Sequence, residues 1–360
     1  MAEVIYNSPN RLKVGRGLPV RVNLSFGVEK PTATSREREK VARILARELR
    51  PDLLMDLSVH KTAPEPWVHI RNIFDGPIGI LPHYLLFSDT HGLCEDSLLE
   101  RIKSVTSSGI NFITVHCSPT HQLMELARQK RKTPVTSRGG SIVIRDMLIN
   151  RRSENIYSKM FDEICDVAQQ TGTVVNLGTA FRSASVADGL DEVVKEELII
   201  QTEYIDRARS KGIQIVLEGP GHIPLGQLTE YWQLIEPLNV SPMPLGPIVT
   251  DRFPVGDHIS SSINVAYLMS LSQGGIINAI TAVEHQGGVP SFHHTFAGLQ
   301  AALIAAQAAS LNYCQDAFHE EQVIADRRAD RQSCVLDSAS AGCTRCEKIC
   351  PLIHSNYPSG

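Results

Sequence analysis

The stretch Ile213-Gln-Ile-Val-Leu-Glu-Gly-Pro-Gly-His222 contains the pattern that decides the fold. An apolar run rich in β-branched residues ends at Glu218, and a tight turn of glycine and proline then presents His222. Continuous apolar runs of this length are typical of parallel strands that are buried on both faces. The stretch therefore predicts a buried strand whose carboxyl end carries chemically useful side chains.

The same pattern recurs along the chain. Eight runs are predicted as strands: Val20–Phe26, Leu53–Ser58, Ile78–Tyr84, Phe112–Cys117, Thr173–Gly178, Ile213–Gly219, Pro244–Thr250 and Ile276–Thr281. Amphipathic segments between them predict helices, including Thr34–Arg50, Glu154–Gln170 and Asp191–Ser210. Thr34 and Glu37 have the spacing of a capping box. Eight alternating units predict a (β/α)8 barrel over residues 1–312. A doubly wound sheet is the alternative, but no Gly-x-Gly-x-x-Gly turn follows the first strand.

Polar residues occur at the carboxyl end of every predicted strand. They are Asn23 and Ser25, Asp56 and Ser58, His83 and Tyr84, His116 and Cys117, Asn176, Glu218 and His222, Asp251, and Glu284 and His285. Active sites of (β/α)8 barrels form at this end of the strands. We therefore expect the barrel to be an enzyme with its site at this mouth.

Composition excludes several classes of protein. The chain has 360 residues, 42% hydrophobic and 21% charged, with a net charge of −4. The chain has no block of basic residues that would predict nucleic-acid binding, and none of its apolar runs is long enough to span a membrane. The first residues do not resemble a signal peptide, and the scattered cysteines do not resemble a disulfide framework, so we expect a cytoplasmic protein.

The C-terminal part departs from the barrel pattern. An alanine-rich helix is predicted at Phe296–Asn312, a charged helix at Asp316–Gln332 and a linker at Ser333–Gly342. We expect residues 313–342 to be a helical segment with a linker, and residues 343–360 to be a separate tail. Cys343, Cys346 and Cys350 lie within eight residues of this tail.

Three thiols so close together predict a metal centre. A 4Fe–4S cluster held by three cysteines leaves one iron open to bind and cleave a ligand. Structural zinc is the alternative, because His354 could serve as a fourth ligand.

Two further motifs suggest ligand sites. His222 and His285 follow different predicted strands, and a closed barrel would bring both to one mouth, where they would suit a divalent metal. In Thr136-Ser-Arg-Gly-Gly-Ser141, Gly139 and Gly140 let backbone amides face a ligand, and Arg138 has the fork that binds phosphate. Ser141 is expected to cap the helix that follows. Asp257 is a possible N-cap of another helix.

These motifs together resemble the phosphomethylpyrimidine synthase family of radical S-adenosylmethionine (SAM) enzymes. The resemblance rests on Ser137-Arg-Gly-Gly-Ser141, Glu218-Gly-Pro-Gly-His222-Ile-Pro, Leu245-Gly-Pro-Ile-Val-Thr-Asp251, Gly256-Asp-His258, Glu284-His285 and the three cysteines. The family includes paralogues that make 5-hydroxybenzimidazole, the lower ligand of cobalamin. The chain resembles a short form without the family's long N-terminal domain.

The resemblance implies a homodimeric lyase that rearranges 5-aminoimidazole ribotide into the thiamine pyrimidine phosphate. Its cofactors would be a 4Fe–4S cluster, SAM and one mononuclear divalent metal, zinc or iron. An external donor such as flavodoxin or ferredoxin would supply electrons. The cluster ligands would be Cys343, Cys346 and Cys350, and the metal ligands His222 and His285. Catalysis is assigned to Glu218, Asp251 and His116. The implied substrate contacts are Asn23, Met55, Tyr84, His116, Ser137, Arg138, Gly139, Arg182 and Glu218.

The chain departs from the family pattern within three motifs. The cysteines are spaced by two and then three residues, where the family usually has two and four. Thr179 replaces an aspartate of the Gly-Asp-Gly-Leu-Arg loop, and Met243 replaces a tyrosine. These changes leave a benzimidazole-forming paralogue as an alternative. Two other classes also remain: a zinc hydrolase using His222, His285 and Asp251, and an inactive ligand-binding paralogue.

Overall fold

The computed structural model describes residues 1–253, 255–331, 333, 334, 345, 346 and 349–354. The chain divides into two compact units, Met1–Asn312 and Tyr313–Gly360. Among the described residues, none of the helices has the length and apolar composition needed to cross a membrane.

The first unit is built around eight parallel strands. In spatial order they are β10 (Ile276–Asn278), β3 (Arg21–Phe26), β4 (Leu53–Asp56), β5 (Ile78–Ile80), β6 (Phe112–Val115), β7 (Val174–Leu177), β8 (Ile215–Leu217) and β9 (Ser241–Pro242). Every neighbouring pair in this order is parallel. Between β9 and β10, the Asn278 amide donates to the carbonyls of Met243 (3.0 Å) and Pro244 (2.9 Å). The predicted (β/α)8 barrel is confirmed.

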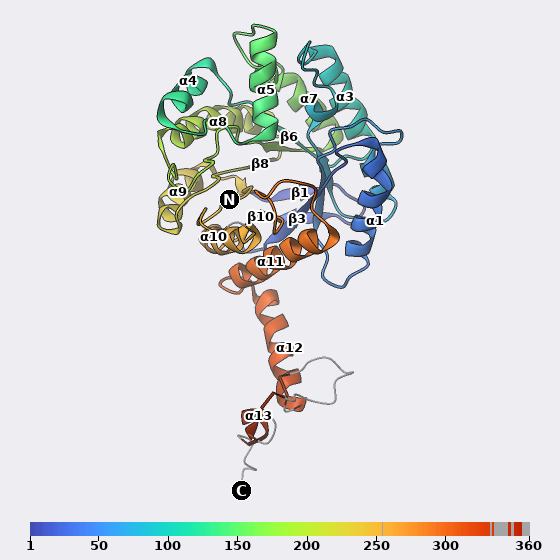
Figure 1. Ribbon diagram of the computed structural model, residues 1–360, viewed down its shortest axis with the longest axis vertical. Coiled ribbons are helices and arrows are strands. Elements are labelled where there is room, and N and C mark those ends of the chain that lie inside the picture. The colour runs from blue at the N-terminus through green and yellow to red at the C-terminus, as the bar shows by residue number, and fades with distance from the viewer. Residues whose placement is uncertain (254, 332, 335–344, 347–348, 355–360) are drawn as a thin grey trace. The chain divides into compact units, whose positions relative to one another are not determined.

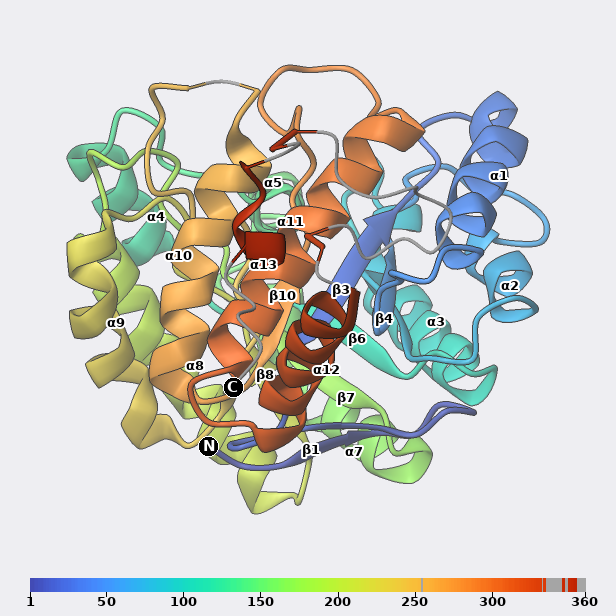
Figure 2. The ribbon, with the colours of Figure 1, turned by 90° about the horizontal axis from the view of Figure 1, so that it is seen from below.

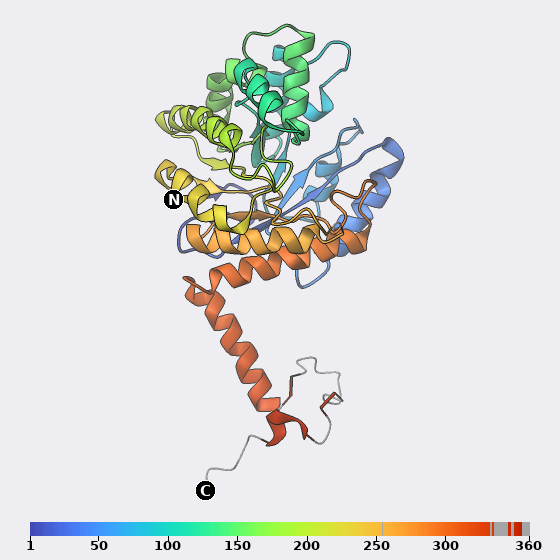
Figure 3. The same cartoon turned by 60° about the vertical axis from the view of Figure 1, so that its left-hand side comes forward.

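Helices surround these strands (Figure 1). They are α1 (Thr34–Leu45), α2 (Pro66–Arg71), α3 (Glu95–Ser107), α4 (His121–Lys130), α5 (Arg138–Ile149), α6 (Ile156–Lys159), α7 (Phe161–Thr171), α8 (Glu192–Ser210), α9 (Leu228–Ile235), α10 (Asp257–Ser272) and α11 (Phe292–Ser310). Short 3-10 turns lie at Pro31–Ala33, Pro82–Leu85, Leu225–Gln227 and Glu236–Leu238. Helices α10 and α11 run side by side (Figure 3). In the second unit, α12 spans Gln315–Arg331 and α13 spans Pro351–His354.

An N-terminal hairpin closes the amino end of the barrel. Strands β1 (Val4–Tyr6) and β2 (Leu12–Val14) pair antiparallel and lie across this end, in dark blue in Figure 2. The Tyr6 ring meets the Phe112 ring edge-on, with centroids 5.6 Å apart, in a core that includes the first residues of several strands. A Cβ on Gly79 would lie 2.2 Å from the Phe112 ring, so only glycine fits there. The plugged amino end leaves the carboxyl end as the open mouth.

Several predicted elements are corrected by the structure. The predicted strand Pro244–Thr250 is wrong: the strand is Ser241–Pro242, and the later residues form a loop. Pro244 and Pro247 lack the N–H groups that a ladder needs. The predicted helix Glu154–Gln170 is interrupted at Met160, between α6 and α7.

The helix caps also differ from the predictions. The capping box of Thr34 and Glu37 is wrong, because Ala33 occupies the N-cap and the Glu37 side chain is buried. Ser141 lies inside α5, and Ser137 is the N-cap whose Oγ accepts from Gly140 N at 3.1 Å. Asp257 is the first residue of α10, after an N-cap at Gly256.

Candidate active site at the barrel mouth

A cavity of about 470 Å³ opens at the carboxyl ends of the strands. Its lining includes these residues from the implied site: Met55, Tyr84, His116, Ser137, Arg138, Gly139, Arg182, Glu218, His222 and His285. Asn23 and Asp251 are not part of the lining. Asn23 donates from Nδ2 to Asn278 Oδ1 at 2.7 Å, and Asn278 itself lines the cavity. The structure therefore gathers most of the implied residues around one space.

His116 and the start of α5 are packed tightly together. Ser137 Oγ lies 3.2 Å from His116 Nε2. A Cβ on Gly139 would lie 2.3 Å from the His116 ring, and a Cβ on Gly178 would lie 2.6 Å from it. Glycine at both positions therefore lets α5 begin directly beside the ring. The first N–H groups of a helix have no partner within it, so the start of α5 together with Arg138 can bind an anion.

His116 is held neutral by its surroundings. Its pKa is well below the usual range, because the ring is buried and lies near His83 and Arg182. The His83 ring is also buried, with its centroid 5.8 Å from that of His116, and its Nδ1 lies 2.7 Å from the Tyr157 hydroxyl. Burial lowers the pKa of His83 to about 3. A neutral His116 can donate or accept one hydrogen bond in the cavity.

Glu218 and Arg182 form the charged part of the cavity beyond β7 and β8. Burial raises the pKa of Glu218, and the nearby Arg182 partly opposes that shift. The carboxylate also accepts from Asn176 Nδ2 at 3.0 Å and from Thr179 N at 3.2 Å. A buried carboxyl group with a raised pKa can take or give a proton during a reaction. Thr179 thus contacts Glu218 through its backbone, although its side chain carries no charge.

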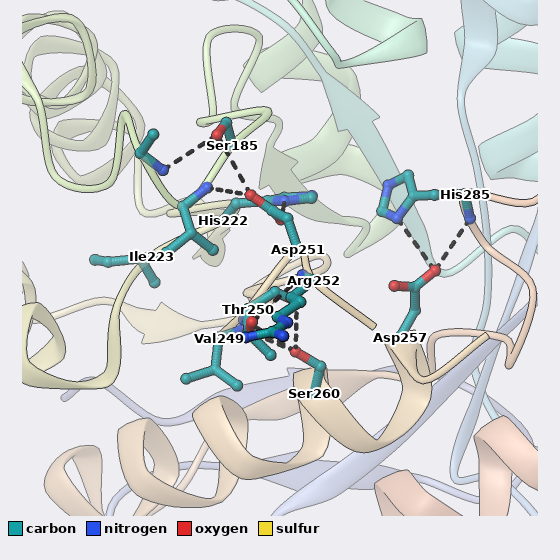
Figure 4. A network of polar contacts seen from close by, with 12 residues as sticks. Ser185, His222, Ile223, Val249, Thr250, Asp251, Arg252, Asp257, Ser260 and His285 are labelled. Carbon is teal, nitrogen blue, oxygen red and sulfur yellow. Dashed lines mark hydrogen bonds and ion pairs between the residues drawn. The ribbon is translucent and has the colours of Figure 1, made fainter. Parts of the chain in front are cut away.

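Two histidines face each other at one side of the mouth. The ring centroids of His222 and His285 lie 5.1 Å apart. Asp251 Oδ1 is 2.6 Å from His222 Nδ1, and Asp257 Oδ2 is 3.2 Å from His285 Nδ1, as Figure 4 shows. A carboxylate at Nδ1 fixes the tautomer and leaves Nε2 as the ligand atom, as in many protein metal sites. Burial lowers the pKa of His222, which keeps that ring neutral as a ligand must be.

This geometry fits a metal held by two imidazoles. No group of three or more His, Cys, Asp or Glu side chains within the described residues is arranged to hold a metal ion. Asp251 sits behind His222 and also accepts from Val186 N at 2.7 Å. It therefore does not complete the three-ligand site that a zinc hydrolase would need. The remaining ligands of a metal here would come from substrate or water.

The second unit, considered by itself, has two described cysteines from the predicted cluster motif. Cys346 and Cys350 are free of disulfides, and a hydrogen bond from Ile349 N to Cys346 O (3.0 Å) closes the turn between them. Free thiols on either side of one turn fit two ligands of an iron–sulfur cluster. Cys343 lies outside the described residues, as do most of the predicted linker and the side chain of His354.

Sequence reasoning missed the residues that support the site. Glu197 is fully buried in α8, and its carboxylate accepts from Ala180 N at 2.6 Å and from Phe181 N at 2.9 Å. It thereby holds the loop that leads to Arg182. The helical spacing of α8 could have indicated that Glu197 is buried, because Glu197 lies on the same helical face as Val193 and Tyr204, which are both buried. Asp257 was expected as a possible N-cap, whereas its carboxylate contacts His285 through both the backbone N–H and Nδ1.

The fold and the ionisable groups in the cavity define a (β/α)8-barrel enzyme that acts on a small molecule. A family model described as the Radical SAM ThiC family matches residues 2–341. The chain belongs to this family, as its motifs predicted.

Curated relatives agree with this assignment. A phosphomethylpyrimidine synthase from Desulforamulus reducens is 31% identical, over 86% of this chain and 73% of the relative. The 5-hydroxybenzimidazole synthase BzaA of Moorella thermoacetica is also 31% identical, over 96% of this chain and 86% of the relative. A phosphomethylpyrimidine synthase from a Thermoanaerobacter species is 33% identical, over 83% of this chain and 70% of the relative. The two activities that the resemblance implied are thus both represented among the relatives.

Proposed function

We propose that this protein is a radical SAM lyase that rebuilds 5-aminoimidazole ribotide into 4-amino-5-hydroxymethyl-2-methylpyrimidine phosphate for thiamine synthesis. The observation that carries the proposal is a single cavity lined by the start of a helix with Arg138, by the buried Glu218 carboxyl group and by the pair His222 and His285. Family membership supplies the reaction class.

The phosphate of the ribotide would bind at the start of α5. Ser137, Arg138 and Gly139 all line the cavity there, and the neighbouring Arg182 adds a second positive charge. A guanidinium forms paired, charge-assisted hydrogen bonds with phosphate oxygens. These contacts would fix one end of the substrate and leave its imidazole ring in the middle of the cavity.

The ring and ribose would then lie among Met55, Tyr84, His116 and Glu218. Met55 offers an apolar surface, while burial raises the pKa of Tyr84 to about 12, so its hydroxyl stays protonated and can donate. Neutral His116 would form a hydrogen bond with a nitrogen of the imidazole ring or with a ribose oxygen. Glu218 would accept or return a proton as bonds rearrange, since burial raises its pKa and so makes the carboxylate a better proton acceptor. Asn23 acts through Asn278, and Asp251 orients His222.

Two bound groups complete the proposal. Cys343, Cys346 and Cys350 would hold the 4Fe–4S cluster, and His222 and His285 would hold zinc or iron. The cluster and SAM would supply the 5′-deoxyadenosyl radical that abstracts hydrogen from the substrate. The chain's own residues position the ribotide and move its protons.

The proposal extends to partners and location. An external donor such as flavodoxin or ferredoxin would reduce the cluster, and the free thiols favour a reducing compartment, the cytoplasm. Homodimerisation is supported by an apolar row on α10, where Ile259, Ile263 and Tyr267 are 57%, 48% and 39% exposed. Such a row on one helical face suits an interface with a second copy.

The second candidate is the synthesis of 5-hydroxybenzimidazole. It is favoured by Thr179 and Met243, which stand in place of the family's usual aspartate and tyrosine, and a relative named BzaA aligns with 96% of the chain. Mass spectrometry of the products from ribotide, SAM and a strong reductant separates the two candidates. A pyrimidine phosphate supports the first proposal, and 5-hydroxybenzimidazole replaces it with the second.

A further inference from the structure

The cavity has a polar wall that the proposed ribotide site does not use. The ribotide residues lie in β4 or follow β5 to β8. This wall instead comes from α1 and the start of α11, which contact each other (Figure 1). Glu37, Lys40 and Thr295 all line the cavity, and we call them the α1–α11 wall. Buried charged groups at this position need a physical explanation.

Only one of the two carboxylate oxygens of Glu37 has a hydrogen-bond partner among the described residues. The residue is 2% exposed, and its Oε1 accepts from Lys40 Nζ at 2.8 Å and from Gly27 N at 3.2 Å. Its other oxygen, Oε2, is buried and has no hydrogen-bond partner among the described residues. Leaving a buried carboxylate oxygen unpaired is costly, so this atom favours a ligand that donates a hydrogen bond.

Thr295 and Lys40 lie in the same wall as Glu37 and have unused hydrogen-bonding groups. Thr295 is 2% exposed, and within the described part of the chain its hydroxyl has no partner. The Lys40 ammonium has three donors, and the described acceptors are Glu37 and the carbonyl of Pro290 at 3.4 Å. The α1–α11 wall therefore offers a ligand three groups: Glu37 Oε2 as a hydrogen-bond acceptor, the Lys40 ammonium as a donor, and the Thr295 hydroxyl, which can donate or accept.

This combination matches a vicinal diol. Each sugar hydroxyl donates one hydrogen bond and accepts others, so one can donate to Glu37 while its neighbour accepts from Lys40. Carboxylates recognise ribose hydroxyls in nucleotide-binding folds for the same reason. A phosphate fits poorly, because the Glu37 carboxylate would repel it.

We propose that the α1–α11 wall binds the ribose hydroxyls of the adenosyl co-substrate. The inference rests on the proposed function, which requires an adenosyl nucleoside in this cavity. It assigns the ribotide and the nucleoside to different walls of one space, with the ribotide phosphate beside α5.

The test is nucleoside binding to the full chain with its cluster reconstituted without oxygen. Isothermal titration would use S-adenosylhomocysteine and 5′-deoxyadenosine, which share the ribose diol, while only the first has an amino-acid end. Thr295→Val keeps the shape and removes a hydroxyl that has no described protein partner, so folding should persist. We expect both dissociation constants to rise roughly 3- to 10-fold, with ribotide binding unchanged. Thr106→Val is the matched control, because that buried hydroxyl bonds Ile102 O at 2.8 Å in α3, away from the cavity lining.

Glu37→Gln is the second variant. It replaces a charged acceptor and should weaken the binding of both nucleosides by about tenfold or more. If this variant does not fold, the result for Thr295→Val alone decides whether the inference holds. Unchanged binding of both nucleosides to Thr295→Val would overturn the inference. Weaker binding of S-adenosylhomocysteine alone would also overturn it, since the wall would then contact the amino-acid end and not the ribose. If the unmodified protein binds neither nucleoside, the proposed function itself fails.

Discussion

Glu197 offers a sharp test of how the site is supported. Its buried carboxylate holds Ala180 N, Phe181 N and Ser118 Oγ, and burial raises its pKa to about 7. In Glu197→Gln, an amide oxygen in place of Oε1 still faces all three donors, while the contact of Phe181 N with Oε2 (2.9 Å) is lost. The variant no longer titrates, and the loss of that one contact does not depend on pH, so it cancels when two pH values are compared.

The size and sign of the effect follow from the pKa. The carboxyl of an unfolded chain titrates near 4.5, so the folded state binds the proton more tightly. This contribution to stability is fully present below about pH 4.5 and is lost as the pH rises through about 7. At about 1.36 kcal/mol per pKa unit, the loss of stability between pH 5 and pH 8 amounts to about 2 to 3 kcal/mol.

The assay is urea unfolding of both proteins at pH 5 and pH 8. Other titrating groups are shared, so they cancel in the difference between the two free energies of unfolding. As the pH rises from 5 to 8, we expect the free energy of unfolding of Glu197→Gln to increase by about 2 to 3 kcal/mol relative to that of the unmodified protein. A difference that stays constant across this range would refute the raised pKa. A difference of opposite sign would show that the buried charge is stabilised.

Three further predictions concern ligands. Arg138→Ala should weaken binding of the ribotide by about 10- to 150-fold, as expected for a lost charge-assisted contact, with Arg138→Lys recovering only part; an equal loss for the dephosphorylated riboside would move the phosphate elsewhere. His222→Ala and His285→Ala should each lose the mononuclear metal by elemental analysis yet keep the cluster, and metal retained by either variant would disprove a shared site. Cys350→Ala should lose iron and sulfide, whereas Cys165→Ala, a buried thiol in α7, should keep them; full cluster content in Cys350→Ala would exclude the cysteine assignment.

Much of the barrel could be predicted because its strands are buried on both faces. Such strands leave continuous apolar runs, as at Phe112–Cys117 and Thr173–Gly178, and their polar ends point to the mouth. The strand Ser241–Pro242 was missed because two residues form no recognisable run. The hairpin of Val4–Tyr6 and Leu12–Val14 was missed for the same reason, since each strand has three residues.

The site was only partly predictable, and the reason is physical. His222 and His285 follow strands that a closed barrel must bring together, so their approach followed from the fold. Their carboxylate partners did not, because Asp251 and Asp257 reach them across loops whose paths the sequence pattern does not specify. Glu37 looked like a helix cap from its spacing, but the structure buries it in the cavity wall.

The most direct test of the account is SAM cleavage by the reconstituted protein. The purified full chain would receive iron, sulfide, a strong reductant and SAM without oxygen, with and without the ribotide, and 5′-deoxyadenosine would be quantified. The account predicts a brown protein that forms 5′-deoxyadenosine together with a rearranged product when the ribotide is present. A colourless protein that contains only zinc, or a brown one that never cleaves SAM, would contradict it.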